Sequence, residues 1–194
     1  MTKTRLEAFS DGVIAIIITI MVLELKVPHG DSATDLIPLI PIFMSYVLSF
    51  VNVGIYWGNH HHLIHTLKSV NTKILWANMN LLFWLSLTPF ATAFMGENHF
   101  SEFSVALYAF LQFMNGIAYT ILLKVITSSE YHDEKLADPL RKQSSKGLFS
   151  LLSYIAAMGA AYLHPAISGL LFLMVAVMWF VPDRNIERQL RNND

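Results

Sequence analysis

Long apolar runs alternate with short polar connections along the whole chain. A helix needs about 20 mainly apolar residues to cross a bilayer, and six runs meet this requirement. The predicted fold class is therefore all-α, a polytopic membrane protein with six transmembrane helices in one domain that covers residues 1–194. We place these helices at about 6–27, 36–64, 73–95, 102–127, 146–163 and 165–182.

Prolines mark several of the predicted helix boundaries, because proline lacks the amide hydrogen that a helix interior requires. Pro28 follows the first helix, and Pro165 and Pro182 lie at the two ends of the sixth. Pro89 falls inside the third helix and predicts a kink there. The segment 128–146 is the one long polar connection, and it has room for a short surface helix.

The positions of the charges predict an orientation. Twelve of the thirteen Lys and Arg residues fall on the same side of the membrane if six helices alternate, and only Lys26 falls on the other. Five or seven helices would scatter these charges over both sides. Cytoplasmic loops carry an excess of Lys and Arg, so we expect a multi-pass protein of the cell (plasma) membrane with both termini in the cytoplasm.

Composition agrees with a bilayer environment and excludes several classes of function. The chain is 54% hydrophobic and 14% charged, whereas soluble domains carry about 25% charged residues. A net charge of −1 provides no general positive field for nucleic acid. The absence of cysteine excludes disulfides and thiolate chemistry. No nucleophile elbow and no phosphate-binding glycine loop occur, so we predict that the protein is not an enzyme.

The first predicted helix carries an apolar stripe beside a hydroxyl group. Ile16, Ile20 and Leu23 follow the spacing i, i+4, i+7 and share one face, with Thr19 next to them. Asp11 points about 140° away from Ile16 at 100° per residue. If copies of this helix surround an axis, the stripe can form a narrow apolar collar that gates by dewetting. Otherwise it is an ordinary surface that faces lipid or another helix.

Polar residues gather at the cytoplasmic ends of the first three helices. Arg5, Ser10 and Asp11 belong to the first helix, and ionisable groups at membrane depth normally face protein or water. One interpretation is a buried polar clamp that holds the first helix against the second and third. The other is a helix cap with interfacial charge. Asn78 and Asn80 are the candidates on the third helix.

The second helix contributes a cluster of histidines, His60 to His62 and His65. His61 and His65 are separated by four residues and could share a metal ion. No cysteine occurs in the chain and no carboxylate lies within the run, so we predict no metal site. A hydrogen-bonded clamp and a pH-responsive patch remain open.

Three passages resemble a known family. The pattern Arg5-x-x-x-Phe9-Ser10-Asp11, followed by Ala15-Ile16 and Thr19, resembles the first-helix signature of the lysosomal-type potassium channel family (transmembrane protein one-seventy-five), in particular its bacterial six-helix members. The Trp57-x-x-His60 step on the second helix resembles the same family. So does the passage from Asn80-Leu81-Leu82-Phe83 to Pro89-Phe90 on the third.

The resemblance implies a potassium-selective leak channel without a re-entrant selectivity filter. It further implies a homotetramer in the lipid bilayer, in which the first helix of each subunit lines a central pore for potassium ions. No cofactor and no nucleic-acid partner are expected. The implied site residues are Ile16, Ile20 and Leu23 at the constriction, Thr19 for selectivity, and Arg5, Ser10, Asp11, His60 and Asn80 in the polar clamp.

Several alternatives stay open. Four consecutive polar residues, 59–62, leave the clamp histidine ambiguous between His60 and His61. Asp11, Glu24 and the histidine cluster are also compatible with a secondary transporter of a cation or small metabolite. A membrane enzyme or metal-binding scaffold built on residues 60–65 is the third hypothesis.

Overall fold

The computed structural model describes residues 2–129 and 137–180, with side chains described outside 137–143. Almost all of these residues are helical, and the described ranges contain no strand. The all-α prediction is confirmed, with six α-helical segments in the described ranges if the broken pair α3 and α4 is counted once and the 3-10 helix is left aside. The elements are α1 (Lys3–Leu23), the 3-10 helix η1 (Ala33–Leu39), α2 (Ile40–His65), α3 (Thr72–Ser86), α4 (Thr88–Glu97), α5 (Glu102–Thr127), α6 (Ala137–Ala160) and α7 (Pro165–Phe180).

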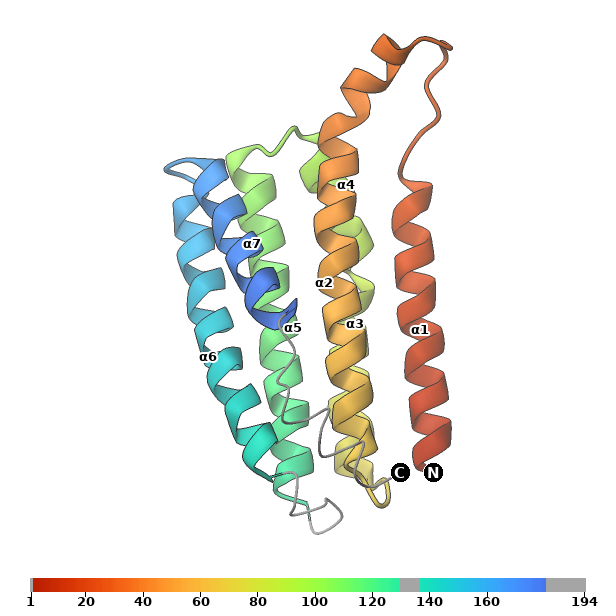
Figure 1. Cartoon of the computed structure of the whole chain (residues 1–194), viewed down its shortest axis with the longest axis vertical. Coiled ribbons are helices and arrows are strands. Elements are labelled where there is room, and N and C mark those ends of the chain that lie inside the picture. Colours follow the sequence, from red (N-terminus) through yellow and green to blue (C-terminus); the bar gives the residue numbers. More distant parts are fainter. Residues whose placement is uncertain (1, 130–136, 181–194) are drawn as a thin grey trace.

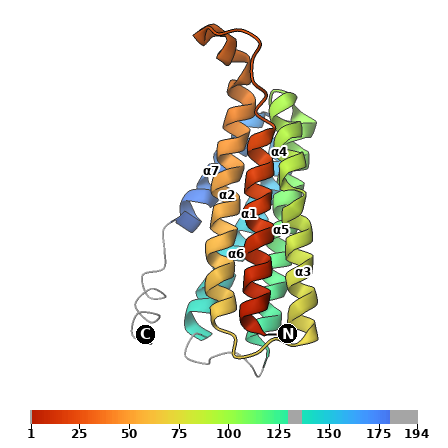
Figure 2. The same cartoon turned by 90° about the vertical axis from the view of Figure 1, so that its right-hand side faces the viewer.

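The helices form an elongated bundle whose connections lie at its two ends (Figure 1). We call the end that carries Lys3 and His65 the lower end, and the end that carries Leu23 and Glu97 the upper end. Helix α1 lies at one edge and packs on α2, α3 and α4, whereas α6 lies at the far edge against α5 and α7. Seen from the α1 side, α2 lies on one flank of α1, and α3 and α4 lie on the other (Figure 2).

The third predicted helix is interrupted where Pro89 predicted a kink. Helix α3 ends at Ser86 and α4 begins at Thr88, so Leu87 separates two helices. Pro89 occupies the first turn of α4, where an amide hydrogen has no intrahelical partner and its loss costs little. Pro41 has the same place at the beginning of α2.

Buried side chains divide into two clusters. One joins α1, α2, α3 and the lower half of α5, and includes Leu6, Ile14 and Leu81. The other joins α4 to α7 and is centred on Tyr108 and Phe172, whose rings are 5.2 Å apart. Helix α1 contributes buried side chains only to the first cluster, so a single face of it packs against the rest of the chain.

Within the described residues, four helical segments are long and apolar enough to cross a membrane: Lys3–Leu23, Ala33–His65, Thr72–Glu97 and Glu102–Thr127. Helix α7 is a shorter apolar helix of 16 residues. Helix α6 begins at Ala137, earlier than the predicted 146, and thereby takes in part of the polar connection 128–146. The rest of that connection from 130 to 136, and the predicted end of the sixth helix at 181–182, lie outside the described residues.

Candidate functional site

Helix α1 has a buried face and an open face. Leu6, Ser10, Ile14, Ile17 and Met21 are buried against the rest of the subunit. The predicted pore stripe lies on the open face, where the exposed fractions are 59% for Ile16, 42% for Ile20 and 74% for Leu23. The subunit therefore leaves this stripe outside its own packing.

Thr19 is also exposed, and its hydroxyl is partly engaged within the helix. Its Oγ1 donates a hydrogen bond of 2.8 Å to the carbonyl oxygen of Ala15. A hydroxyl that donates one bond still carries lone pairs that can accept or coordinate. An oxygen ligand is thus available beside Ile16 and Ile20.

A buried hydrogen-bonded chain joins the first three helices. The Asn78 side chain of α3 donates from Nδ2 to Ser10 Oγ at 2.9 Å, and its Oδ1 lies 2.7 Å from His60 Nε2. All three side chains are fully buried. A carboxamide oxygen can only accept, so His60 Nε2 is assigned as the donor. A buried polar clamp between α1, α2 and α3 is therefore present in the fold.

The clamp differs from the prediction in its third-helix member. Asn80 lies two residues, or about 200° of helix rotation, beyond Asn78 and so points to another side of α3. Among the described residues its side chain has no hydrogen bond, and it is only half-buried. Of the two candidate histidines, the structure places His60 in the buried chain.

Arg5 and Asp11 lie outside the buried chain. The Arg5 side chain is exposed, and only its backbone N–H bonds to Thr2 Oγ1, at 3.4 Å. Asp11 is half-buried and accepts a hydrogen bond from the Trp57 indole. The physical reason is rotation about the helix axis, since Asp11 is about 100° from Ser10 and faces α2 alone.

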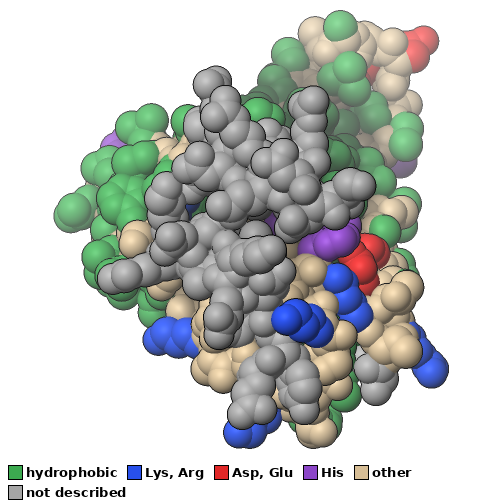
Figure 3. Space-filling view, turned by 60° about the horizontal axis from the view of Figure 1, so that its bottom comes forward, with side chains coloured by type: hydrophobic (Ala, Val, Ile, Leu, Met, Phe, Trp, Pro, Cys, Tyr) green, Lys and Arg blue, Asp and Glu red, His purple; other side chains and the backbone are tan. Residues whose placement is uncertain are grey.

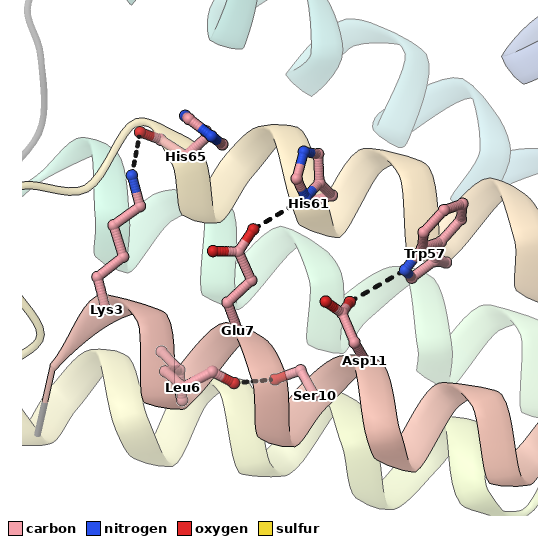
Figure 4. Close-up of polar contacts among 8 residues, drawn as sticks. All are labelled: Lys3, Leu6, Glu7, Ser10, Asp11, Trp57, His61 and His65. Atoms are coloured by element: carbon pink, nitrogen blue, oxygen red, sulfur yellow. Dashed lines mark hydrogen bonds and ion pairs between the residues drawn. The ribbon is translucent and has the colours of Figure 1, made fainter.

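Three polar contacts form a ladder between α1 and α2 at the lower end (Figure 4). On each of the two helices, the residues that make these contacts are spaced four apart and therefore share one face of the helix. Two helices that run in opposite directions can therefore pair these residues one by one. The ladder contacts join Lys3 Nζ to the His65 carbonyl oxygen at 2.8 Å, Glu7 Oε1 to His61 Nδ1 at 2.9 Å, and Trp57 Nε1 to Asp11 Oδ1 at 3.0 Å.

The sequence contained a signal for this ladder that the prediction did not use. Lys3, Glu7 and Asp11 are spaced i, i+4, i+8 on the first helix. Trp57, His61 and His65 have the same spacing on the second. Two matching polar rows on adjacent antiparallel helices indicate paired contacts even before the structure is seen.

The histidine cluster is a packing and hydrogen-bonding feature within the described chain. The rings of His61 and His65 have their centroids 5.3 Å apart. No group of three or more His, Asp or Glu side chains in the described residues could hold a metal ion.

An open groove of about 630 Å³ runs between α1 and α4. Glu24 and Glu97 lie at its upper end, and Lys26 bonds to Glu97 at 2.9 Å. The hydrogen bond and the charge of Glu97 raise the pKa of the Lys26 ammonium above its ordinary value. The apolar walls consist of Val13, Ile16, Ile17 and Ile20 on α1 and of Pro89, Phe90, Ala93 and Phe94 on α4.

Basic side chains lie on the lower surface of the described chain, next to neighbouring acidic and histidine groups (Figure 3). Lys3, Lys68 and Lys73 belong to this end, while Glu97 and Glu102 belong to the upper end. The charge asymmetry expected from the sequence is thus kept in the fold. The predicted charges at 135, 184, 188 and 191 lie outside the described residues.

Comparisons with known proteins agree with this architecture. The family model described as "Endosomal/lysosomal potassium channel TMEM175" matches residues 5–89. A protein of Chryseobacterium sp. named as a potassium channel is 50% identical over 193 residues, which is 100% of both chains. The rat "Endosomal/lysosomal proton channel TMEM175" is 35% identical over 96 residues, 43% of this chain and 19% of the rat protein.

A solved structure has the same fold. The crystal structure of "a lysosomal potassium-selective channel TMEM175 homolog" from Chamaesiphon minutus matches with a TM-score of 0.82 and 24% identity, over 92% of this chain and 96% of that one. The chain therefore has the fold of that protein, with helices long enough to cross a membrane several times. With the full-length bacterial relative, the comparisons show that the chain belongs to the TMEM175 family. This is a family of ion channels, which confirms the prediction that the protein is not an enzyme.

Proposed function

We propose that four copies of this chain form a potassium-selective leak channel in the cell membrane, with α1 of each copy around a central pore. The observation that carries the proposal is the division of α1 into two faces. Ile14, Ile17 and Met21 are buried in the subunit, whereas Ile16 and Ile20 are left exposed. The name of the full-length bacterial relative supports potassium as the permeant ion.

The narrowest point of this pore is Ile16. An ion in a wide aqueous vestibule keeps its water until it meets four isoleucine side chains, which offer no oxygen ligand in exchange. Passage then costs dehydration, and potassium gives up water more readily than sodium. Thr19 supplies hydroxyl oxygens one turn away, so selectivity is modest compared with that of a carbonyl filter. A slight tightening of the collar closes the channel.

The buried clamp sets the radius of the collar. The Ser10–Asn78–His60 chain and the ladder hold the lower half of α1 against α2 and α3. Both groups of contacts leave the Ile16 side of the helix free. Movement of α1 toward or away from the axis therefore has to strain or break them.

In this proposal the lower end faces the cytoplasm. Lys3, Lys68 and Lys73 lie at that end, whereas Lys26 is the one described lysine placed at the other end, and the positive-inside rule therefore favours this orientation. Cations that enter from outside then meet Glu24 and Glu97 first.

The test is ion flux in proteoliposomes that contain the purified chain. We expect potassium flux that rises linearly with the gradient, in contrast to the saturable, coupled uptake of a transporter. Ile16→Asn should increase the leak and reduce the preference for potassium over sodium, because an amide hydrates the collar. Leu173→Asn is a matched control, since it puts the same group on an exposed position of α7.

Two results would overturn the proposal. One is the absence of potassium flux from protein that inserts and folds. The other is an Ile16→Asn variant that behaves like the parent chain in the same assay. A pH-sensitive dye inside the vesicles shows whether protons are carried instead, as the name of the rat relative indicates for that protein.

A further inference from the structure

We infer that the groove between α1 and α4 of one subunit receives the upper part of α2 from the next subunit in the ring. The inserted stripe consists of Phe43, Val47 and Phe50, and the partner is a second copy of this chain. The inference rests on the proposed function, because it takes α1 to face the central axis. It adds which surfaces meet and at which level they do so.

The α2 stripe lies on the flank next to α1. Phe43, Phe50 and Trp57 are separated by seven residues, which is about two helical turns, and so share one side of α2. Trp57 and His61 on this side contact α1 of their own subunit. The stripe therefore continues upward the side of α2 that contacts α1 at the lower end.

The upper part of this stripe is left uncovered within the subunit. The exposed fractions are 51% for Phe43, 40% for Val47 and 45% for Phe50. Tyr46 connects the two phenylalanines, with ring centroids 6.4 Å from Phe43 and 6.0 Å from Phe50. The stripe is thus an apolar, largely aromatic ridge.

The groove lies on the opposite flank of α1. Figure 2 places α2 on one side of α1, and α3 and α4 on the other. Phe90 is 64% exposed on the α4 wall of the groove. The wall on α1 includes Ile16 and Ile20, so the groove is continuous with the proposed pore.

Rotational symmetry brings these two flanks together. If α1 faces a common axis, rotation places the α2 flank of each subunit beside the α4 flank of its neighbour. Such a contact uses two different surfaces, and contacts of this type close into rings. The apolar ridge on α2 and the apolar groove between α1 and α4 are two such different surfaces.

Internal contacts fix the level at which the surfaces meet. Thr92 of α4 donates a hydrogen bond of 2.7 Å to Ser49 of α2. Four residues further up, a Cβ at Gly96 would lie 2.6 Å from Ser45 Oγ. The two helices are antiparallel, so Phe50 lies at the level of Phe90. Rotation about an axis along the membrane normal preserves depth, so Phe50 of one subunit meets Phe90 of the next.

The chain has no cysteine, which makes disulfide crosslinking a direct test. The double variant Phe50→Cys with Phe90→Cys is oxidised with copper phenanthroline in membranes and separated under non-reducing conditions. We expect a series of dimer, trimer and tetramer, because each subunit carries one cysteine for each neighbour. Phe50→Cys alone should stay monomeric, since two α2 ridges do not meet in a heterologous ring.

The matched control pairs Phe50→Cys with Ile155→Cys on α6. Ile155 is 49% exposed. It lies at a level similar to that of Phe50, because the ring centroid of its neighbour Tyr154 is 6.3 Å from that of Phe172, and the Phe172 ring contacts Tyr108. Helix α6 lies at the far edge of the bundle (Figure 1), so this pair should not crosslink.

Native mass measured on the same samples separates the two proposals. Four subunits without crosslinks between positions 50 and 90, or with equal crosslinks in the control pair, would overturn the interface. Dimers formed by Phe50→Cys alone would show an isologous contact and would also overturn it. A lone protomer or a simple dimer by native mass would instead overturn the proposed tetrameric channel.

Discussion

Asn78 and Ser10 are joined by a hydrogen bond of 2.9 Å between Asn78 Nδ2 and Ser10 Oγ, and both side chains are fully buried. The amide of Asn78 also bonds His60, so one residue of α3 holds both α1 and α2. In the proposed channel, this residue controls the position of the pore helix without lining the pore. Several consequences can be measured.

Asn78→Ala should destabilise the protein more than Asn80→Ala. The first change leaves His60 Nε2 buried without its partner, and an unsatisfied buried group costs about 1–3 kcal/mol. Ser10 loses one of its two hydrogen bonds and keeps the one to the Leu6 carbonyl oxygen. Asn80 is only half-buried and has no hydrogen bond in the described chain, so its loss should be close to neutral. Thermal unfolding in detergent compares the two variants. Equal destabilisation, or a larger effect at Asn80, would show that the clamp has been assigned to the wrong residue.

Gly96→Ala should destabilise the contact between α2 and α4. An added Cβ would lie 2.7 Å from the Cα of Ile42, a backbone atom that cannot move aside cheaply. Overpacking of this kind costs about 1–3 kcal/mol. Gly159→Ala is the control, because nothing lies within 4 Å of its added Cβ. It should be neutral or slightly stabilising, since alanine favours a helix. A tolerated Gly96→Ala would contradict the close approach of the two helices.

Thr19→Val should reduce the preference for potassium over sodium, while Thr19→Ser should keep it. Valine has nearly the shape of threonine but no oxygen ligand, whereas serine retains the hydroxyl. We expect the permeability ratio to fall by up to about tenfold, equivalent to about 1.4 kcal/mol. Reversal potentials under bi-ionic conditions give the ratio. A valine variant with unchanged selectivity would remove Thr19 from the proposed mechanism.

From pH 6 upward (roughly the range in which a carboxylate is ionised), the contact between Lys26 and Glu97 should depend on pH only in the alkaline range. The folded-state pKa of Lys26 is raised above its ordinary value of 10.5, and the main cause is the hydrogen bond that Lys26 donates to Glu97. A raised pKa stabilises the fold fully below the ordinary value, and the effect is lost as pH rises through the folded value. The difference in melting temperature between the parent chain and Lys26→Met should be small and constant from pH 6 to 9 (roughly the range below both pKa values), and should vanish well above pH 10.5. A difference that changes near neutral pH would point to another group.

Much of the fold could be predicted, because a membrane-spanning helix is recognised in a sequence by the length and apolarity of its residues. Pro89 predicted a kink where the structure has a break at Leu87. Helical periodicity predicted that Ile16, Ile20 and Leu23 share one face, but it did not decide whether that face packs on another helix or lies exposed, as it does in this fold. The choice between Asn78 and Asn80 could not be made, because it depends on the rotation of α3 relative to α1 and α2. Local sequence carries no information on that rotation when both faces contain a polar residue.

The ladder was missed for a different reason. Glu7 has no place in the predicted clamp, although its spacing to Lys3 and Asp11 is visible in the sequence. Its partner His61 entered the prediction as an alternative to His60 in the clamp, as a candidate metal ligand or as part of a pH-responsive patch. Because α1 and α2 are antiparallel neighbours, both histidines have a role, one in the core and one at the surface.

The most direct test of the central claim, that α1 lines the ion path, is cysteine accessibility along the upper half of α1 in this cysteine-free chain. Leu23→Cys and Met21→Cys channels are exposed from outside to a charged thiosulfonate reagent during potassium current recording. The account predicts rapid block of Leu23→Cys and no effect on Met21→Cys, whose position is buried within the subunit. Current through Leu23→Cys that persists after complete modification would place α1 away from the path of the ions.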